Sequence, residues 1–118
     1  MNKPLNGQIK HELMSWLRLT EFLRQENALL KYRLSELVDN SDDDNFLQIA
    51  EHFQNEFLLK DEALKSLIKD LSDYSDMVVK QERVSLIIHA KLRKKIHTFE
   101  EKYSRLSIEF NKKMLQNN

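Results

Sequence analysis

Residues 46–78 read FLQIAEHFQNEFLLKDEALKSLIKDLSDYSDMV, and the spacing of their apolar side chains decides the fold. These side chains recur at alternating steps of four and three residues, with one lysine in the row: Phe46, Ala50, Phe53, Phe57, Lys60, Leu64, Leu67, Leu71, Tyr74 and Val78. This is the spacing of the a and d positions of a coiled-coil seam. Because such a stripe must be covered by another apolar surface, the stretch predicts a long helix packed against neighbouring helices.

The composition of the chain also predicts long helices in an all-α fold. Charged residues make up 32% of the 118 residues, which is above the globular average, and one glycine with one proline leaves few residues for turns. The length suits a single domain, residues 1–118. The sequence shows neither a secretion signal nor an apolar run long enough to span a membrane. We therefore expect a cytoplasmic protein that does not bind membranes.

The first helix is expected over residues 8–38, after a frayed polar lead. Its four-three row consists of Ile9, Leu13, Trp16, Thr20, Leu23, Asn27, Leu30, Leu34 and Leu37. Within this row, Leu23–Leu37 resembles a leucine zipper, with leucine at three successive d positions and Asn27 at an a position. The resemblance implies a parallel dimer whose register a buried asparagine fixes. The upstream segment lacks the dense basic region of zipper transcription factors, so no DNA-binding role follows.

A second apolar row widens the apolar arc of this helix beyond what a two-stranded seam requires. The row contains Leu19, Phe22 and Leu29. A wide arc indicates more than one neighbouring helix. It favours a bundle of three or more helices over a simple dimeric zipper.

Two segments are candidates for turns between helices. Residues 39–45 collect turn-forming aspartate, asparagine and serine, and Asn45 with Gln48 fits a capping box that would start a second helix over residues 45–72. Residues 72–76, SDYSD, have mediocre helix propensity, although the four-three row continues through them. A break there gives an antiparallel bundle with a third helix over residues 76–115. Without it, the chain would form a helical hairpin with a long second arm, which we consider the less favoured alternative.

The antiparallel arrangement also predicts the register of the first two helices. Residues whose numbers sum to about 83 would lie level, which places Asn27 near Glu56 and Phe57. Asn27 could then form a hydrogen bond with Glu56 of the same chain. Lys60 is expected to extend its ammonium group past the seam.

The apolar row of the last helix changes its spacing. It consists of Ile88, Leu92, Ile96, Phe99, Tyr103, Leu106, Phe110 and Met114. Two consecutive steps of four, from Ile88 to Leu92 to Ile96, predict a stutter that shifts the seam around the helix.

No constellation in the sequence predicts catalysis, a metal site or a cofactor. The four histidines, His11, His52, His89 and His97, lack both the Glu-x-x-His spacing of di-iron bundles and the spacing of a zinc-protease helix, so we expect solvated surface side chains. The aspartate-rich turn lacks the central glycine and final glutamate of a calcium loop. A single glycine supplies neither a nucleophile elbow nor a phosphate loop. We predict a protein that is not an enzyme and has no small-molecule substrate.

The net charge of zero conceals an alternation along the chain. Residues 1–35 hold six Lys/Arg against three Asp/Glu, a net +3; residues 36–76 hold three against twelve, a net −9; and residues 77–118 hold ten against four, a net +6. The acidic segment can therefore lie between two basic ones. One face of the last helix gathers Lys91, Lys94, Lys95, Lys102 and Arg105. This face could meet anionic lipid or nucleic acid phosphates, and it predicts an alternative function, in which a helical protein associates with nucleic acid. It could equally pair with the acidic segment of the chain.

The pattern as a whole favours a non-enzymatic coiled-coil module that binds protein, as a scaffold, adaptor or assembly factor. We expect it to self-associate, most simply as a homodimer, by burying its apolar stripes against partner helices. The residues predicted to form the interface are Trp16, Leu23, Asn27, Leu30, Leu92, Ile96, Phe99, Tyr103 and Leu106.

Overall fold

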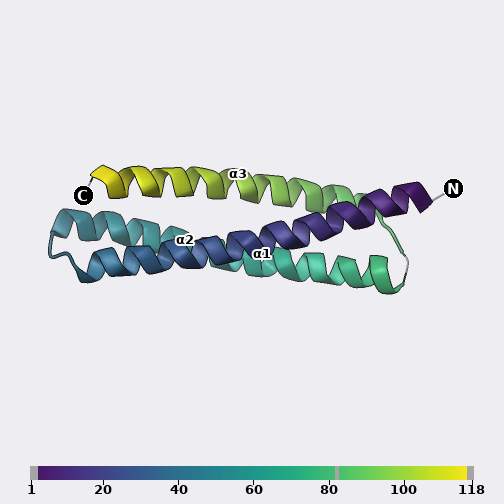
Figure 1. The fold of residues 1–118 in the computed structure, drawn as a ribbon, viewed down its shortest axis with the longest axis horizontal. Coiled ribbons are helices and arrows are strands. Elements are labelled where there is room, and N and C mark those ends of the chain that lie inside the picture. The colour runs from purple at the N-terminus through teal and green to yellow at the C-terminus, as the bar shows by residue number, and fades with distance from the viewer. Residues whose placement is uncertain (1–2, 82, 117–118) are drawn as a thin grey trace.

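Three long helices lie side by side in the computed structural model, which describes residues 3–81 and 83–116 (Figure 1). The rod measures 63 × 20 × 17 Å, and the described residues include no strand. The predicted all-α antiparallel bundle is confirmed in its three-helix form. None of the described helices has an apolar stretch long enough to cross a membrane. The elements are α1 (Lys3–Asp39), α2 (Asp44–Ser75), the π-helical segment η1 (Asp76–Lys80) and α3 (Leu86–Gln116).

The long first helix crosses the other two at an angle. Figure 1 shows the start of α1 beside the start of α3, whereas the end of α1 lies beside the start of α2. The helix begins at Lys3, earlier than the predicted position near residue 8. Pro4 is compatible with this start because proline is tolerated in the first helical turn, where its missing N–H would have no partner.

The four-three rows of α1 and α2 form the core, as the sequence predicts. Every apolar position of the α2 row is buried, and so is every position of the α1 row except Leu37, which is partly buried. Thr20 is buried in this row, and its hydroxyl donates to the Trp16 carbonyl at 3.0 Å. The polar atoms of Thr20 are therefore satisfied within its own helix.

The turn between α1 and α2 lies where the sequence predicts it, but its capping residue differs. Asp43, not Asn45, is the N-cap of α2, and its carboxylate accepts a hydrogen bond from the Asn45 N–H at 3.0 Å. The predicted capping box of Asn45 and Gln48 is therefore wrong. Asp43 takes the role because it is the last residue with extended backbone, which is the conformation an N-cap needs.

The break between the second and third helices is not at residues 72–76. The chain remains helical through Ser75 and continues as η1 to Lys80, and α3 begins only at Leu86. Leu71, Tyr74 and Val78 are all buried, so packing of the continuing row outweighs the weak helix propensity of the serines and aspartates between them. Arg83 N–H donates to the Met77 carbonyl at 3.0 Å, and Ser85 Oγ accepts from the Ile88 N–H at 3.2 Å. These bonds satisfy helix ends at the observed break.

The predicted stutter in α3 is also absent at its expected position. Ile88 is 36% exposed, whereas His89 is 3% exposed and occupies the core position. With His89 in the row, the steps to Leu92, Ile96 and Phe99 are three, four and three. The expectation that His89 is a solvated histidine is therefore wrong, while His11, His52 and His97 are exposed.

Candidate interaction surface

An open groove of about 690 Å³ runs between α2 and α3. From α2, Leu59, Ala63 and Ser66 line the groove, and Lys60, Leu67 and Asp70 complete that side. From α3, it is lined by Lys91, Lys94, Lys95, Thr98, Phe99 and Lys102. Apolar side chains from both helices thus lie between a rim formed by α2 and a rim formed by α3. The α3 rim is strongly basic.

Aromatic contacts join α2 and α3 near both ends of the groove. Phe110 of α3 packs edge-on against Phe53 and Phe57, with ring centroids 5.3 and 5.1 Å apart. Near the other end, the rings of Tyr74 and His89 lie 5.6 Å apart. The groove occupies the segment between these contacts, where α2 presents the small residues Ala63 and Ser66. Small side chains there leave the space that larger ones would fill.

Lys60 interrupts the apolar row beside this groove. Its side chain is only 14% exposed, and its ammonium group lies 3.8 Å from the Glu56 carboxylate. The expectation that Lys60 extends its charge past the seam agrees with this geometry, because the stem is covered while the charge meets a carboxylate one turn away. The stem adds methylene surface to the groove lining.

The basic rim carries more positive charge than the protein itself neutralises. Lys95 contacts Asp70 at 3.3 Å across the groove. Lys91, Lys94 and Lys102 have no carboxylate partner among the described residues. Since exposed cations without partners raise the local potential, the α3 rim attracts negative charge.

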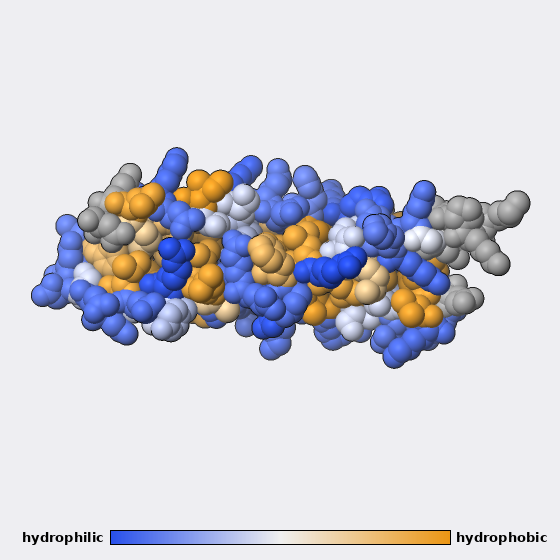
Figure 2. All heavy atoms as spheres, viewed as in Figure 1, coloured by the Kyte–Doolittle hydropathy of each residue, from blue (hydrophilic) through white to orange (hydrophobic). Residues whose placement is uncertain are grey.

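A second hollow of about 280 Å³ prolongs the groove toward the α2–α3 turn. It shares Asp70, Lys91 and Lys95 with the first and extends to Met77 and Ile88. The combined surface follows α2 from Leu59 and continues to Met77 in η1. Figure 2 shows the face of the rod on which α1 crosses in front of α2, and there too apolar side chains are visible between charged ones.

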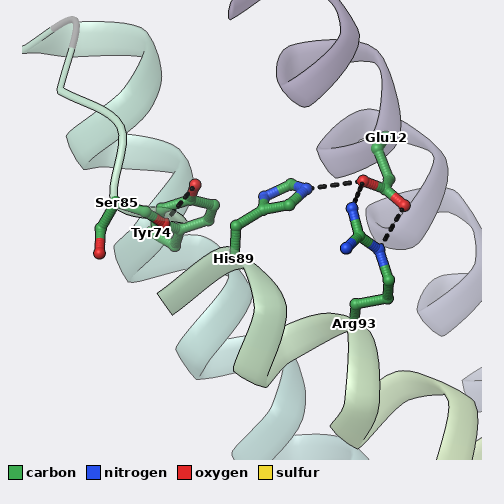
Figure 3. A network of polar contacts seen from close by, with 5 residues as sticks. All are labelled: Glu12, Tyr74, Ser85, His89 and Arg93. Atoms are coloured by element: carbon green, nitrogen blue, oxygen red, sulfur yellow. Dashed lines mark hydrogen bonds and ion pairs between the residues drawn. The ribbon is translucent and has the colours of Figure 1, made fainter. Parts of the chain in front are cut away.

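A polar network on another side of α3 ties that helix to α1 (Figure 3). Glu12 of α1 contacts His89 Nε2 through Oε1 at 2.7 Å, and Arg93 donates to both oxygens of the same carboxylate, at 2.6 and 3.0 Å. The hydrogen bonds from Arg93, joined by the contact with His89, lower the pKa of Glu12 to about 2. The network thus joins α1 to α3 through residues that do not line the groove.

The His89 ring is enclosed by aromatic neighbours. By ring centroids, Trp16 lies 4.6 Å and Tyr74 lies 5.6 Å from it. The Tyr74 hydroxyl donates to the Ser85 carbonyl at 3.3 Å (Figure 3). His89 Nδ1 is buried and has no hydrogen-bond partner among the described residues. Because the residue is 3% exposed, a substrate in solution has little access to the imidazole.

The nine residues predicted to form an interface are all buried inside the single chain. Asn27 donates to the Phe57 carbonyl at 3.0 Å and to Asp61 Oδ1 at 2.7 Å, which confirms its level with Phe57 but replaces Glu56 by Asp61 as its partner. The other eight, Trp16, Leu23, Leu30, Leu92, Ile96, Phe99, Tyr103 and Leu106, belong to the same core cluster. The apolar stripes are therefore covered without a second chain.

The residues predicted for nucleic acid are exposed, and most of them share one surface. Lys91, Lys94, Lys95 and Lys102 line the groove, while Arg105 is exposed on α3 but is not among the lining residues. Sequence reasoning missed the α2 side of this surface, Leu59 and Ala63, and the Glu12 network. A step of three from His89 to Leu92 was the available signal for His89, whereas nothing local links Glu12 to Arg93, 81 residues later.

The described residues offer no group of three or more His, Cys, Asp or Glu side chains that could hold a metal ion. A scan against protein-family models, a search of curated proteins and a search of solved structures found no significant match to this chain.

Proposed function

We propose that this chain is a non-enzymatic protein-interaction module, acting as a scaffold, adaptor or assembly factor in the cytoplasm, and that the α2–α3 groove receives its protein partner. One observation carries the proposal: an apolar lining lies beside a rim whose Lys91, Lys94 and Lys102 have no carboxylate partner among the described residues. Protein interfaces combine an apolar centre with a polar rim in this way.

The exposed apolar surface favours protein over nucleic acid as the occupant. Leu59 is 61% exposed, and with Ala63 and Phe99 it lines the surface that lies next to the lysines. Phosphate backbones are bound by cations and hydrogen-bond donors and gain nothing from burying an aliphatic lining. A protein side chain gains roughly 25 cal/mol for each Å² of apolar surface it covers there.

Self-association, if it occurs, must use surfaces other than the seam. The predicted homodimer stripes are buried within one chain, while Phe22 and Leu29 on α1 remain 58% and 56% exposed. These two side chains are the part of the predicted second apolar row that the described helices leave mostly exposed. A homodimer would therefore bury a surface of this kind, outside both the seam and the groove.

Site-specific photo-cross-linking tests the proposal. A photoreactive side chain placed at Ala63, in the groove, is compared in living cells with the same side chain at Ala28, exposed on α1. We expect a protein adduct that forms from position 63 only. The captured protein is then purified and titrated against the chain, and Ala63→Arg, which fills the groove, should weaken its binding about tenfold or more.

Three outcomes would count against a protein partner in the groove. Identical adducts from both positions would mean that capture is unspecific. A nucleic acid adduct from position 63 would support the alternative function instead. Undiminished affinity of the purified partner for Ala63→Arg would place the binding surface elsewhere.

A further inference from the structure

We infer that the occupant of the groove is an acidic amphipathic helix, which lies along α2 and α3 as a fourth helix of the bundle. This inference rests on the proposed function and adds the secondary structure and charge of the partner. It follows from the length of the groove, the nature of its walls and the unequal charge of its two rims.

The length of the groove matches several helical turns. On the α2 side, the lining residues run from Leu59 to Asp70 in the first hollow and reach Met77 of η1 with the second. At 1.5 Å per residue these stretches are about 17 and 27 Å long. A helix of about 18 residues spans the longer one.

The walls of the groove favour a helix over an extended segment. Both walls are α-helices, whose backbone N–H and C=O groups already bond within α2 and α3. An extended peptide binds by adding main-chain hydrogen bonds to a sheet edge, and no such edge exists here among the described residues. A helical partner satisfies its own backbone and needs only an apolar ridge to enter the groove.

The charge of the two rims differs, and this difference determines the flanks of the partner. The α3 rim carries Lys91, Lys94, Lys95 and Lys102. The α2 side is neutral at Leu59, Ala63 and Ser66. The two charged residues on that side already lie near opposite charges, Lys60 near Glu56 and Asp70 near Lys95. A complementary helix therefore has an apolar ridge, acidic residues on the flank toward α3 and small or neutral residues on the flank toward α2.

A second copy of this chain fits the groove less well. Two copies related by a twofold axis bury the same patch on both sides. If the grooves faced each other, Lys91, Lys94 and Lys102 of both copies would converge without carboxylates between them. Like charges placed together in this way oppose association.

The test uses a designed peptide of about 18 residues. Leucines at steps of three and four form its ridge, glutamates occupy one flank and glutamines the other. A second peptide carries lysine in place of each glutamate. Fluorescence anisotropy of the labelled peptides against the full chain should show that the acidic peptide binds about tenfold tighter than the basic one, with the difference shrinking as salt is added.

Charge reversal of the rim separates recognition from structural damage. In Lys91→Glu/Lys94→Glu the preference should invert, so that the basic peptide binds tighter. Loss of fold cannot produce an inverted preference. The control Arg18→Glu/Lys65→Glu makes the same change in net charge at two exposed positions outside the groove lining, and it should keep the original preference.

Several results would overturn the acidic helix. Equal affinity for both peptides, an unchanged preference in Lys91→Glu/Lys94→Glu, or a change of oligomer mass caused by Ala63→Arg would each do so, the last by showing that a second copy occupies the groove. Rim-dependent binding to phosphatidylserine vesicles without binding of either peptide would assign the surface to lipid.

The failure of this inference differs from failure of the proposed function. If the protein cross-linked at position 63 binds through a basic or extended segment, the groove is still a protein site and only the acidic helix is wrong. If no protein adduct forms at position 63, the proposed function itself fails.

Discussion

The two faces of α2 are closed in different ways. Toward α1, Asn27 bonds both the Phe57 carbonyl and Asp61, and Lys31 forms an ion pair with Asp61, so polar contacts join the middle of the interface. Toward α3, the aromatic contacts lie at the two ends and the middle is the open groove. Buried polar contacts thus fix the register of α2 on α1, whereas the face of α2 toward α3 stays open in its middle.

The largest expected effect comes from removing an aromatic contact that closes the α2–α3 face. Phe110 is 1% exposed, and Phe110→Ala should lower the free energy of unfolding by about 3–5 kcal/mol, through lost burial and the cavity left behind. Urea unfolding followed by circular dichroism measures this. The matched control is Phe22→Ala, at an exposed position, which should change stability by about 0.5 kcal/mol or less. If both variants lost the same free energy of unfolding, the Phe110 contact would not be what holds α3 against α2 at that end.

The second largest effect is expected from Asn27→Ala, at the interface of α1 and α2. The change leaves the Asp61 carboxylate without its hydrogen bond from Asn27 and should destabilise the protein by about 1–3 kcal/mol. The matched variant is Asn55→Ala, on the exposed side of α2, for which little change is expected. If Asn27→Ala left the free energy of unfolding unchanged, the packing of α1 on α2 would not depend on the hydrogen bonds of Asn27.

The Glu12 network, which joins α1 to α3, predicts that the free energy of unfolding depends on pH. The pKa of Glu12 is lowered from 4.5 in the unfolded chain to about 2 in the folded one, so its contribution to stability is complete above pH 4.5 and is lost as the pH falls toward 2. The side chain is 34% exposed, and solvent screening reduces the effect to about 1 kcal/mol. Urea unfolding measured between pH 2 and 6 gives the free energy of unfolding at each pH. This free energy should change less with pH in Glu12→Gln than in the exposed control Glu62→Gln.

The smallest effect on stability is expected in the groove. Lys91→Gln/Lys94→Gln should change the free energy of unfolding by about 0.5 kcal/mol or less, because neither lysine has a carboxylate partner among the described residues. Thermal unfolding measures it. A large loss would mean that the basic rim holds α3 in place, and the groove would then be a structural seam instead of a binding surface.

Periodicity predicted the packing rows better than it predicted the helix ends. The α2 row was readable from residue spacing because burial imposes it on the sequence. Its end was not readable, since Ser72 and Asp73 are weak helix formers that packing holds in a helix, and the true break at residues 81–85 contains neither glycine nor proline. His89 escaped prediction because a histidine in the core looks polar in sequence and its partner Glu12 lies in another helix.

The candidate surface was only half visible in the sequence. The basic side could be found because Lys91, Lys94, Lys95 and Lys102 share one face of a single helix. The apolar side comes from Leu59 and Ala63 on a different helix, and no local pattern reports how two helices are placed in space. The lysines alone predicted contacts with nucleic acid phosphates, whereas the apolar lining beside them is the observation behind the proposal of an acidic protein partner.

The odd number of helices has a geometric consequence. Because the chain traverses the rod three times, the start of α1 and the end of α3 lie at opposite tips (Figure 1). In a two-helix hairpin, by contrast, both ends of the chain would lie at the same tip. Segments joined to the two ends of this bundle would be held apart by a spacer nearly as long as the 63 Å rod.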